Sequence, residues 1–290
     1  MKQTIIFIVF SFFFLSSLSG QNLYRFRLLL SEKDLNEYSV DQPMRFLSEK
    51  AIEKRIKYRI PIDSTDFPIS NIYLSRLKEQ GMSIITQSKW MNSVVVECSD
   101  SLKGIQLKEL DFVDSVKLVY LKKIPTLESI FIRNERIPSK EEVTTISTDR
   151  NNKDSNYYGQ AFEQIHIHQG NLLHEAGFKG NGITIALLDA GFSNADKIEG
   201  LKDAITGFKD FTIADNNELF GSTVSDHGTK VFSAIATNLP NQMVGTAPKA
   251  SFWLFRTEDA TYEFPIEEDF WAAAMEYADV LLSCSQSPPE

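Results

Sequence analysis

Residues 183–192 read ITIALLDAGF, and this stretch decides the fold class. It is a short run that is apolar on both faces, and it ends at Asp189. Such a run is typical of a parallel strand that helices cover on each side. In open α/β sheets, the functional groups follow the carboxyl ends of the strands. The stretch therefore predicts an α/β domain with a parallel sheet, and it places Asp189 at the functional edge of that sheet.

Two later stretches fit the same domain. Residues 250–256, ASFWLFR, predict a second buried strand, and residues 267–278, EEDFWAAAMEYA, predict a helix. Phe270 and Tyr277 share one face of that helix, and Trp271 lies beside them. We expect these aromatic side chains to pack in the core, which is their usual role.

A histidine lies between a turn and a helix in residues 225–236, SDHGTKVFSAIA. Ser225 or Asp226 can cap a helix that starts near His227. There the helix dipole favours the neutral ring, which can accept a proton. A lone histidine in this position is more often structural. Asp189 changes this interpretation, because a buried carboxylate can hold the ring in one tautomer and stabilise the charge that it acquires.

Three motifs together resemble the N-terminal half of a subtilisin-like serine protease, a member of the subtilase or peptidase S8 family. They are GNGITIALLDAGF, DHGTKV and VGTAPKASFWLFR, in this order, and the resemblance covers residues 157–279. It implies peptide-bond hydrolysis, with Asp189 as the orienting acid and His227 as the general base. Ala190 departs from the family pattern, which has a hydroxyl residue after the aspartate. The resemblance implies no organic cofactor. Calcium is common in subtilases, but no site for it is assigned because no acidic loop of recognisable spacing appears.

Residues 21–122 alternate between strand-like and helix-like segments. These segments read LYRFRLLL, MRFLSEKAIEKRIKY, YLSRLKEQG, MSIITQS, NSVVVECS, SLKGIQLKEL and DSVKLVYL. The pattern predicts a small α+β domain, an antiparallel sheet with helices on one face. By the same resemblance it looks like the ferredoxin-like propeptide of secreted subtilases, which assists folding and blocks the cleft. An unrelated α+β binding module is the alternative. Residues 123–156 are polar and predict a linker, which by the resemblance contains the maturation cut.

The ends of the chain and its charge limit where it can act. Residues 1–20 carry Lys2, an apolar run and then small residues, the layout of a secretory signal peptide. We therefore expect a secreted or periplasmic protein that begins near Gln21. The apolar run is too short to span a membrane.

With 30 Lys and Arg against 39 Asp and Glu, the formal net charge of −9 argues against nucleic acid as a partner. Two cysteines, Cys98 and Cys284, do not make a disulfide scaffold.

The third member of a subtilisin triad is a serine that follows the histidine. The residues after His227 contain no G-T-S-M-A type motif. Residues 280–290, where the resemblance ends, include Ser283, Ser285 and Ser287, but no glycine that could build a strained nucleophile turn. We expect this polypeptide to be truncated before the nucleophilic serine and to be inactive alone.

Two other functions remain open at this stage. The chain could be a non-catalytic, propeptide-type inhibitor or chaperone that binds a related protease through residues 21–122. It could also hold a metal, because His166 and His168 have the spacing of two ligands on one strand face, with His174 nearby. No H-E-x-x-H motif accompanies them, and we expect them to be surface histidines.

Overall fold

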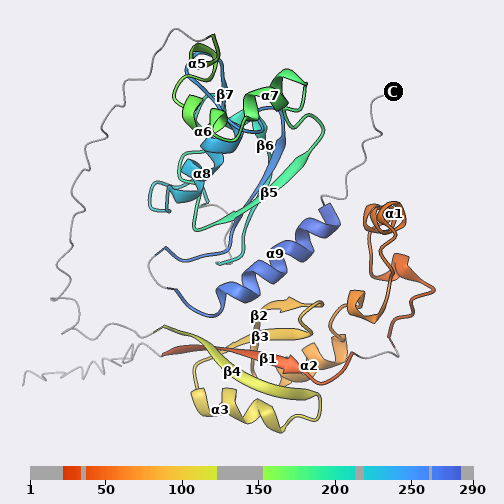
Figure 1. The fold of residues 1–290 in the computed structure, drawn as a ribbon. Helices are drawn as coiled ribbons and strands as arrows, with labels where there is room; N and C mark the ends of the chain where they lie inside the picture. The colour runs from red at the N-terminus through yellow and green to blue at the C-terminus, as the bar shows by residue number, and fades with distance from the viewer. Residues whose placement is uncertain (1–21, 34–36, 123–152, 213–218, 261–262, 282–290) are drawn as a thin grey trace, which may run out of the picture.

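The computed structural model describes residues 22–33, 37–122, 153–212, 219–260 and 263–281. These residues form two units, each with its own sheet, and one long helix lies between the two sheets (Figure 1). The predicted signal peptide, residues 123–152 of the predicted linker and residues 282–290 lie outside the described ranges.

The first unit is an antiparallel sheet with helices. Its strands are β1 (Leu23–Leu30), β2 (Ser83–Ser88), β3 (Ser93–Cys98) and β4 (Val113–Lys122). Its helices are α1 (Glu49–Tyr58), α2 (Asn71–Glu79) and α3 (Ser101–Gln106), with short 3-10 turns at Pro43–Arg45, Ser64–Asp66 and Leu107–Glu109. All three strand pairings are antiparallel, in the order β2-β3-β1-β4. This order confirms the ferredoxin-like α+β arrangement.

The two faces of this sheet have different partners. Phe26 and Leu28 of β1 point into a core shared with α2 and α3, where Leu77 is fully buried. Because successive side chains of a strand alternate between faces, Arg27 points the other way. On that opposite face the sheet packs against Ile266 and the long helix α9.

The second unit contains the predicted parallel sheet. Its strands are β5 (Thr184–Asp189), β6 (Ile205–Asp210) and β9 (Ser251–Arg256), in the order β5-β9-β6, and β7 (Asn238–Leu239) pairs with β8 (Met243–Val244). Its helices are α5 (Lys153–Tyr158), α6 (Phe162–His166), α7 (Gly170–Glu175), α8 (His227–Ala236) and α9 (Glu267–Leu281), with a 3-10 turn at Lys202–Ala204. Helix α5 begins within the range expected to be linker.

Helices cover both faces of this parallel sheet. On one face, Phe232 of α8 packs edge-on against Phe252 of β9, with ring centroids 4.9 Å apart. On the other face, Phe255 of β9 packs against Ala274 of α9. Helix α9 is therefore shared: it covers the parallel sheet and also contacts the antiparallel sheet (Figure 1).

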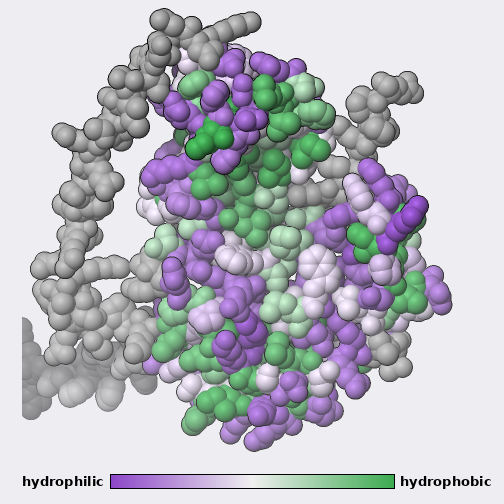
Figure 2. Space-filling model, in the orientation of Figure 1, coloured by the Kyte–Doolittle hydropathy of each residue, from purple (hydrophilic) through white to green (hydrophobic). Residues whose placement is uncertain are grey.

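Two burial expectations were wrong. Strand β5 is only half-buried over Thr184–Leu188, because in the described part of the chain it pairs with β9 alone and so forms a sheet edge. Hydrophobic side chains gather over this edge (Figure 2). Trp271 is 47% exposed although Phe270, one residue earlier, is 3% exposed. No described helix is long and apolar enough to cross a membrane.

Candidate active site

Asp189 is the last residue of β5 and its carboxylate is buried. Parallel pairing sets it opposite Arg256, the last residue of β9, and the backbone N–H of Thr257 donates to its carbonyl at 3.1 Å. The backbone N–H of Ala190 donates to Oδ1 of the carboxylate at 2.7 Å. Since Ala190 has no hydroxyl group, the turn after the aspartate holds the carboxylate through the backbone.

His227 is the first residue of α8. Its backbone N–H donates to the Ser225 hydroxyl at 3.2 Å, so one of the two predicted capping residues makes a bond at the start of the helix. Asp226 occupies the capping position without such a bond, and its carboxylate pairs with Lys230 one turn later, at 2.9 Å.

The contact that the sequence predicts between the two residues is present. Nδ1 of His227 lies 2.9 Å from Oδ2 and 3.0 Å from Oδ1 of Asp189. The aspartate side chain is 10% exposed and the histidine side chain is 69% exposed. A buried acceptor therefore holds one ring nitrogen, and the exposed ring leaves Nε2 available to a reactant.

This contact depends on a close approach at Gly228. A Cβ atom at that position would lie 2.5 Å from the carbonyl oxygen of Gly191 and 2.9 Å from the Cβ of Asp189. Real Cβ atoms do not come so near, so only glycine allows α8 to start this close to the end of β5. A glycine at this position of the DHGTKV motif indicates such a close approach of another chain segment, and the structure confirms it.

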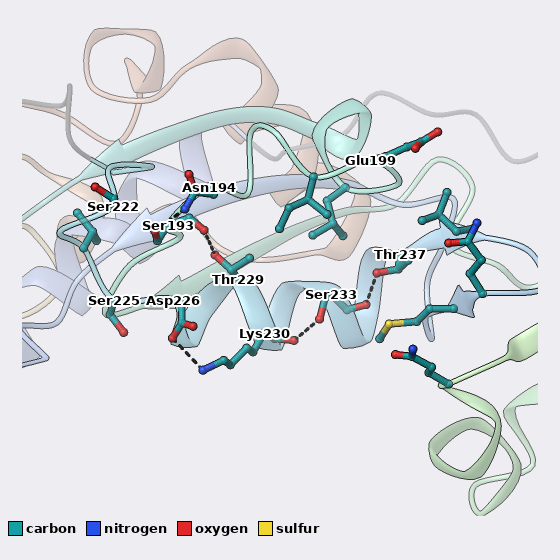
Figure 3. A pocket seen from close by; sticks show the side chains of 17 residues that line it. Ser193, Asn194, Glu199, Ser222, Ser225, Asp226, Thr229, Lys230, Ser233 and Thr237 are labelled. Atoms are coloured by element: carbon teal, nitrogen blue, oxygen red, sulfur yellow. Dashed lines mark hydrogen bonds and ion pairs between the residues drawn. The ribbon is translucent and has the colours of Figure 1, made fainter. Parts of the chain in front are cut away.

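A cavity of about 770 Å³ lies along α8, beside the Asp189–His227 pair but separate from it (Figure 3). Its lining includes Ser193, Asp226, Thr229 and Lys230, whereas neither Asp189 nor His227 lines it. One bond across its wall, from the Thr229 hydroxyl to the Ser193 carbonyl at 2.9 Å, ties the first turn of α8 to the loop after β5. The cavity thus borders the segment that holds the histidine in place.

The other histidines do not form the strand-like pair that the sequence suggested. His166 lies in helix α6, not in a strand. His174 is 5% exposed, with Nδ1 3.0 Å from the Tyr158 hydroxyl and Nε2 3.0 Å from the Thr246 carbonyl oxygen. Because a carbonyl only accepts, Nε2 carries the proton and the hydroxyl donates to Nδ1. Burial raises the pKa of Tyr158 to about 12. Within the described ranges, no group of three or more His, Cys, Asp or Glu residues could hold a metal.

The two units are joined by a buried arginine. Arg27 of β1 donates to both carboxylate oxygens of Asp269 at 2.7 Å, to Glu268 at 2.8 Å and to the Pro265 carbonyl at 2.8 Å. The side chains of Arg27 and Asp269 are 8% and 2% exposed. Because a buried charge without a partner is unfavourable, this ion pair holds the sheet of the first unit against the start of α9.

A second ion cluster joins the units at the other end of α9. Asp279 accepts from Arg55 at 3.1 Å and from Lys54 at 2.8 Å, both on α1. Arg55 also pairs with Asp66 of its own unit. These contacts are not predictable from sequence patterns, and the one local signal is a charged residue, Arg27, between the apolar neighbours Phe26 and Leu28.

Comparison with known families assigns the first unit. Residues 25–135 match the peptidase S8 propeptide domain of Bacteroidota. The match supports the likeness to a subtilase propeptide that the resemblance implies, and it extends past Lys122 into the predicted linker.

The whole chain is similar to two solved proteases. The epidermin leader peptide processing serine protease of Staphylococcus aureus is 10% identical, and the match covers 89% of this chain and 48% of that one, with a TM-score of 0.49. Fervidolysin, a keratinolytic enzyme of Fervidobacterium pennivorans related to subtilisin, is 13% identical over 90% of this chain and 34% of its own, with a TM-score of 0.46. The chain thus spans about half or less of the length of these structures. No curated protein matches it.

Between the two ion clusters, the propeptide domain binds one more carboxylate of α9. Glu276 accepts from the backbone N–H groups of Lys89 and Trp90 at 3.1 Å each, and from the Ser88 hydroxyl. The turn between β2 and β3 thus forms a small anion site. Four acidic side chains of α9 thus contact the propeptide domain: Glu268 and Asp269 at the start of the helix, and Glu276 and Asp279 further along it.

The pKa values of two of these carboxylates shift in opposite directions. Burial raises the pKa of Asp269, and the hydrogen bonds from Arg27 offset this only in part. Burial also acts to raise the pKa of Asp279, but hydrogen bonds from Lys54 and Arg55 outweigh it and the pKa falls. A lowered carboxylate pKa stabilises the folded state above the ordinary pKa and loses that effect as the pH drops through the lowered value. A falling pH therefore removes the contribution of Asp279 to the stability of the folded state, whereas for Asp269, whose pKa is raised, the link between pH and stability has the opposite sign.

Proposed function

We propose that the chain is the N-terminal part of the precursor of a secreted subtilisin-like serine endopeptidase, and that its propeptide domain is docked on the peptidase unit. The observation that carries the proposal is the short contact between Nδ1 of His227 and the buried carboxylate of Asp189. The order of these residues, an aspartate after a strand and then a histidine at a helix start, supports it as well.

Each residue has one role in this proposal. Asp189 holds the ring so that Nδ1 carries a proton and Nε2 is free. Nε2 of His227 then takes the proton of a serine hydroxyl as that oxygen attacks a peptide carbonyl, and later gives the proton to the leaving amine. The nucleophilic serine is not among the described residues, and Ser283, Ser285 and Ser287 have no sequence context for that role.

The 290-residue polypeptide should therefore hydrolyse no peptide above the level of a His227→Ala control. It should also show no labelling by a fluorophosphonate, since the acyl-enzyme step needs an activated serine. Casein hydrolysis and mass spectrometry after labelling check this. Labelling of any serine that disappears in His227→Ala would show that the polypeptide has its own nucleophile.

Sequencing the DNA past codon 290 in all three frames is an independent test. We expect it to locate a G-T-S-M-A type segment, and the absence of such a segment from every frame would contradict the proposal.

The proposal includes export from the cytoplasm. Lys2 and the apolar run that follows support a signal peptide cut near Gln21. We expect the intact mass of protein recovered outside the cytoplasm to correspond to a chain that lacks about the first twenty residues. A cytoplasmic product that retains Met1 would contradict the assignment.

A second candidate function is inhibition or chaperoning of a related protease in trans. The contacts that favour it are the buried pairs of Arg27 and Arg55 with α9, because the same arginines could bind an equivalent acidic helix of another peptidase. Residues 22–122 should then inhibit a purified subtilisin-like protease, and Arg27→Ala should weaken the inhibition. Equal inhibition by both versions would argue against this function.

A further inference from the structure

A second cavity lies between the two units. It has a volume of about 1010 Å³, and residues of both units line it. Ile84 of β2 lies on the side of the first unit, and Phe211, which follows β6, and Tyr277 of α9 lie on the side of the second. Neither Asp189 nor His227 lines it, so the proposed mechanism gives this cavity no role. Pockets of roughly this size between folded units, with apolar and aromatic walls, commonly bind small organic molecules.

Two half-buried lysines, one from each unit, line this cavity. Lys89 follows β2 in the first unit, and Lys209 lies in β6 of the second. The Nζ atom of Lys209 lies 4.1 Å from the ring centroid of Tyr277 and 4.8 Å from that of Phe211. Burial lowers the pKa of Lys209. Within the described ranges, neither lysine forms an ion pair with a carboxylate, so both ammonium groups lack a countercharge from the protein.

The three carboxylates on the cavity wall are bound to other groups. Glu97 pairs with Arg25 at 2.8 Å, and Asp210 pairs with Arg256 at 3.2 Å. Glu276 accepts from two backbone N–H groups and one hydroxyl in the turn between β2 and β3. Because a half-buried cation is stabilised by an opposite charge close to it, the unpaired ammonium groups of this cavity favour an anionic ligand.

We propose that the cavity binds a small organic anion that has an aromatic or acyl body and one carboxylate group. The carboxylate pairs with the ammonium groups of Lys89 and Lys209, and the body lies against the rings of Phe211 and Tyr277. Because the walls come from both units, only the docked arrangement has this site, and binding stabilises the docking by linkage. The site is independent of peptidase chemistry and goes beyond the proposed function.

Two matched ligands test the site in the full chain. Cinnamate carries the carboxylate, and cinnamyl alcohol has the same body without the charge. Isothermal titration calorimetry should show that cinnamate binds about tenfold more tightly, which is the effect of one charge-assisted hydrogen bond. Equal affinities for the two ligands, or no binding of cinnamate up to millimolar concentration, would overturn the proposal.

Substitution of each lysine tests whether both units hold the ligand. Lys209→Met and Lys89→Met each remove one ammonium group and keep a long apolar side chain, so each should weaken cinnamate binding about tenfold and leave cinnamyl alcohol binding unchanged. Lys202→Met is the matched control, because Lys202 is exposed, lies shortly before β6 and does not line the cavity. If either cavity variant bound cinnamate as tightly as this control, the carboxylate would not lie between the two units and the proposal would be wrong.

Discussion

Replacing Arg27 by alanine should undo the docking of the propeptide domain on α9. Asp269, whose side chain is 2% exposed, would remain buried without its cation, and Glu268 would lose its partner as well. Removal of one partner from a buried ion pair costs about 3–5 kcal/mol. We expect the full chain to unfold in one urea transition and Arg27→Ala to unfold in two, with the second unit unfolding first because α9 loses its cover.

Arg25→Ala is the control for this experiment. Arg25 lies two residues earlier on the same strand, but it pairs with Glu97 inside the propeptide domain, and both side chains are about one-fifth exposed. Its loss should cost about 1 kcal/mol or less and should leave one transition. An Arg27→Ala variant that unfolds in one transition, with the same midpoint as Arg25→Ala, would show that the buried pair does not hold the units together.

Replacing Gly228 by alanine should separate Asp189 from His227. The new Cβ would meet the carbonyl oxygen of Gly191 and the Cβ of Asp189. Neither atom can move away by rotation of a side chain. Helix α8 must then shift, and Nδ1 of His227 moves out of hydrogen-bond range of Asp189. Overpacking of this kind costs about 1–3 kcal/mol, measurable as a lower urea midpoint.

Lys230→Ala on the same helix distinguishes this effect from a general change in helix stability. Lys230 is exposed and makes a surface pair with Asp226 only, so its replacement should change the unfolding free energy by about 0.5 kcal/mol or less. If Gly228→Ala proved as stable as Lys230→Ala, or more stable, the close approach of α8 and β5 would not be required.

The sequence predicted the dyad because its signals are local. Asp189 ends an apolar strand and His227 starts a capped helix, and each feature can be recognised within about ten residues. Secondary structure in the propeptide domain was predictable for the same reason. The short alternation of polar and apolar residues around His166 led to the wrong prediction of a strand. A pattern of so few residues also occurs in helices, and α6 is only one turn and a half long.

The contacts between the two units could not be predicted in this way. Arg27 and Asp269 are 242 residues apart in sequence, and nothing in either segment indicates the other. Helical spacing predicted that α9 has an apolar face, but it could not tell which residues a second sheet would cover. As a result Trp271 was expected in the core, whereas its side chain is 47% exposed.

The tautomer of His227 tests the central claim most directly. Two-bond ¹H–¹⁵N correlation of the full chain at about pH 8, where histidine is neutral, shows which ring nitrogen carries the proton. The Asp189 contact predicts the proton on Nδ1 of His227, whereas His174, whose Nε2 faces a carbonyl oxygen, should carry it on Nε2. In Asp189→Ala, His227 should change to the Nε2–H form that free histidine prefers, and His174 should not change. A proton on Nε2 of His227 in the unaltered chain would contradict the proposed role of Asp189 and, with it, the catalytic assignment.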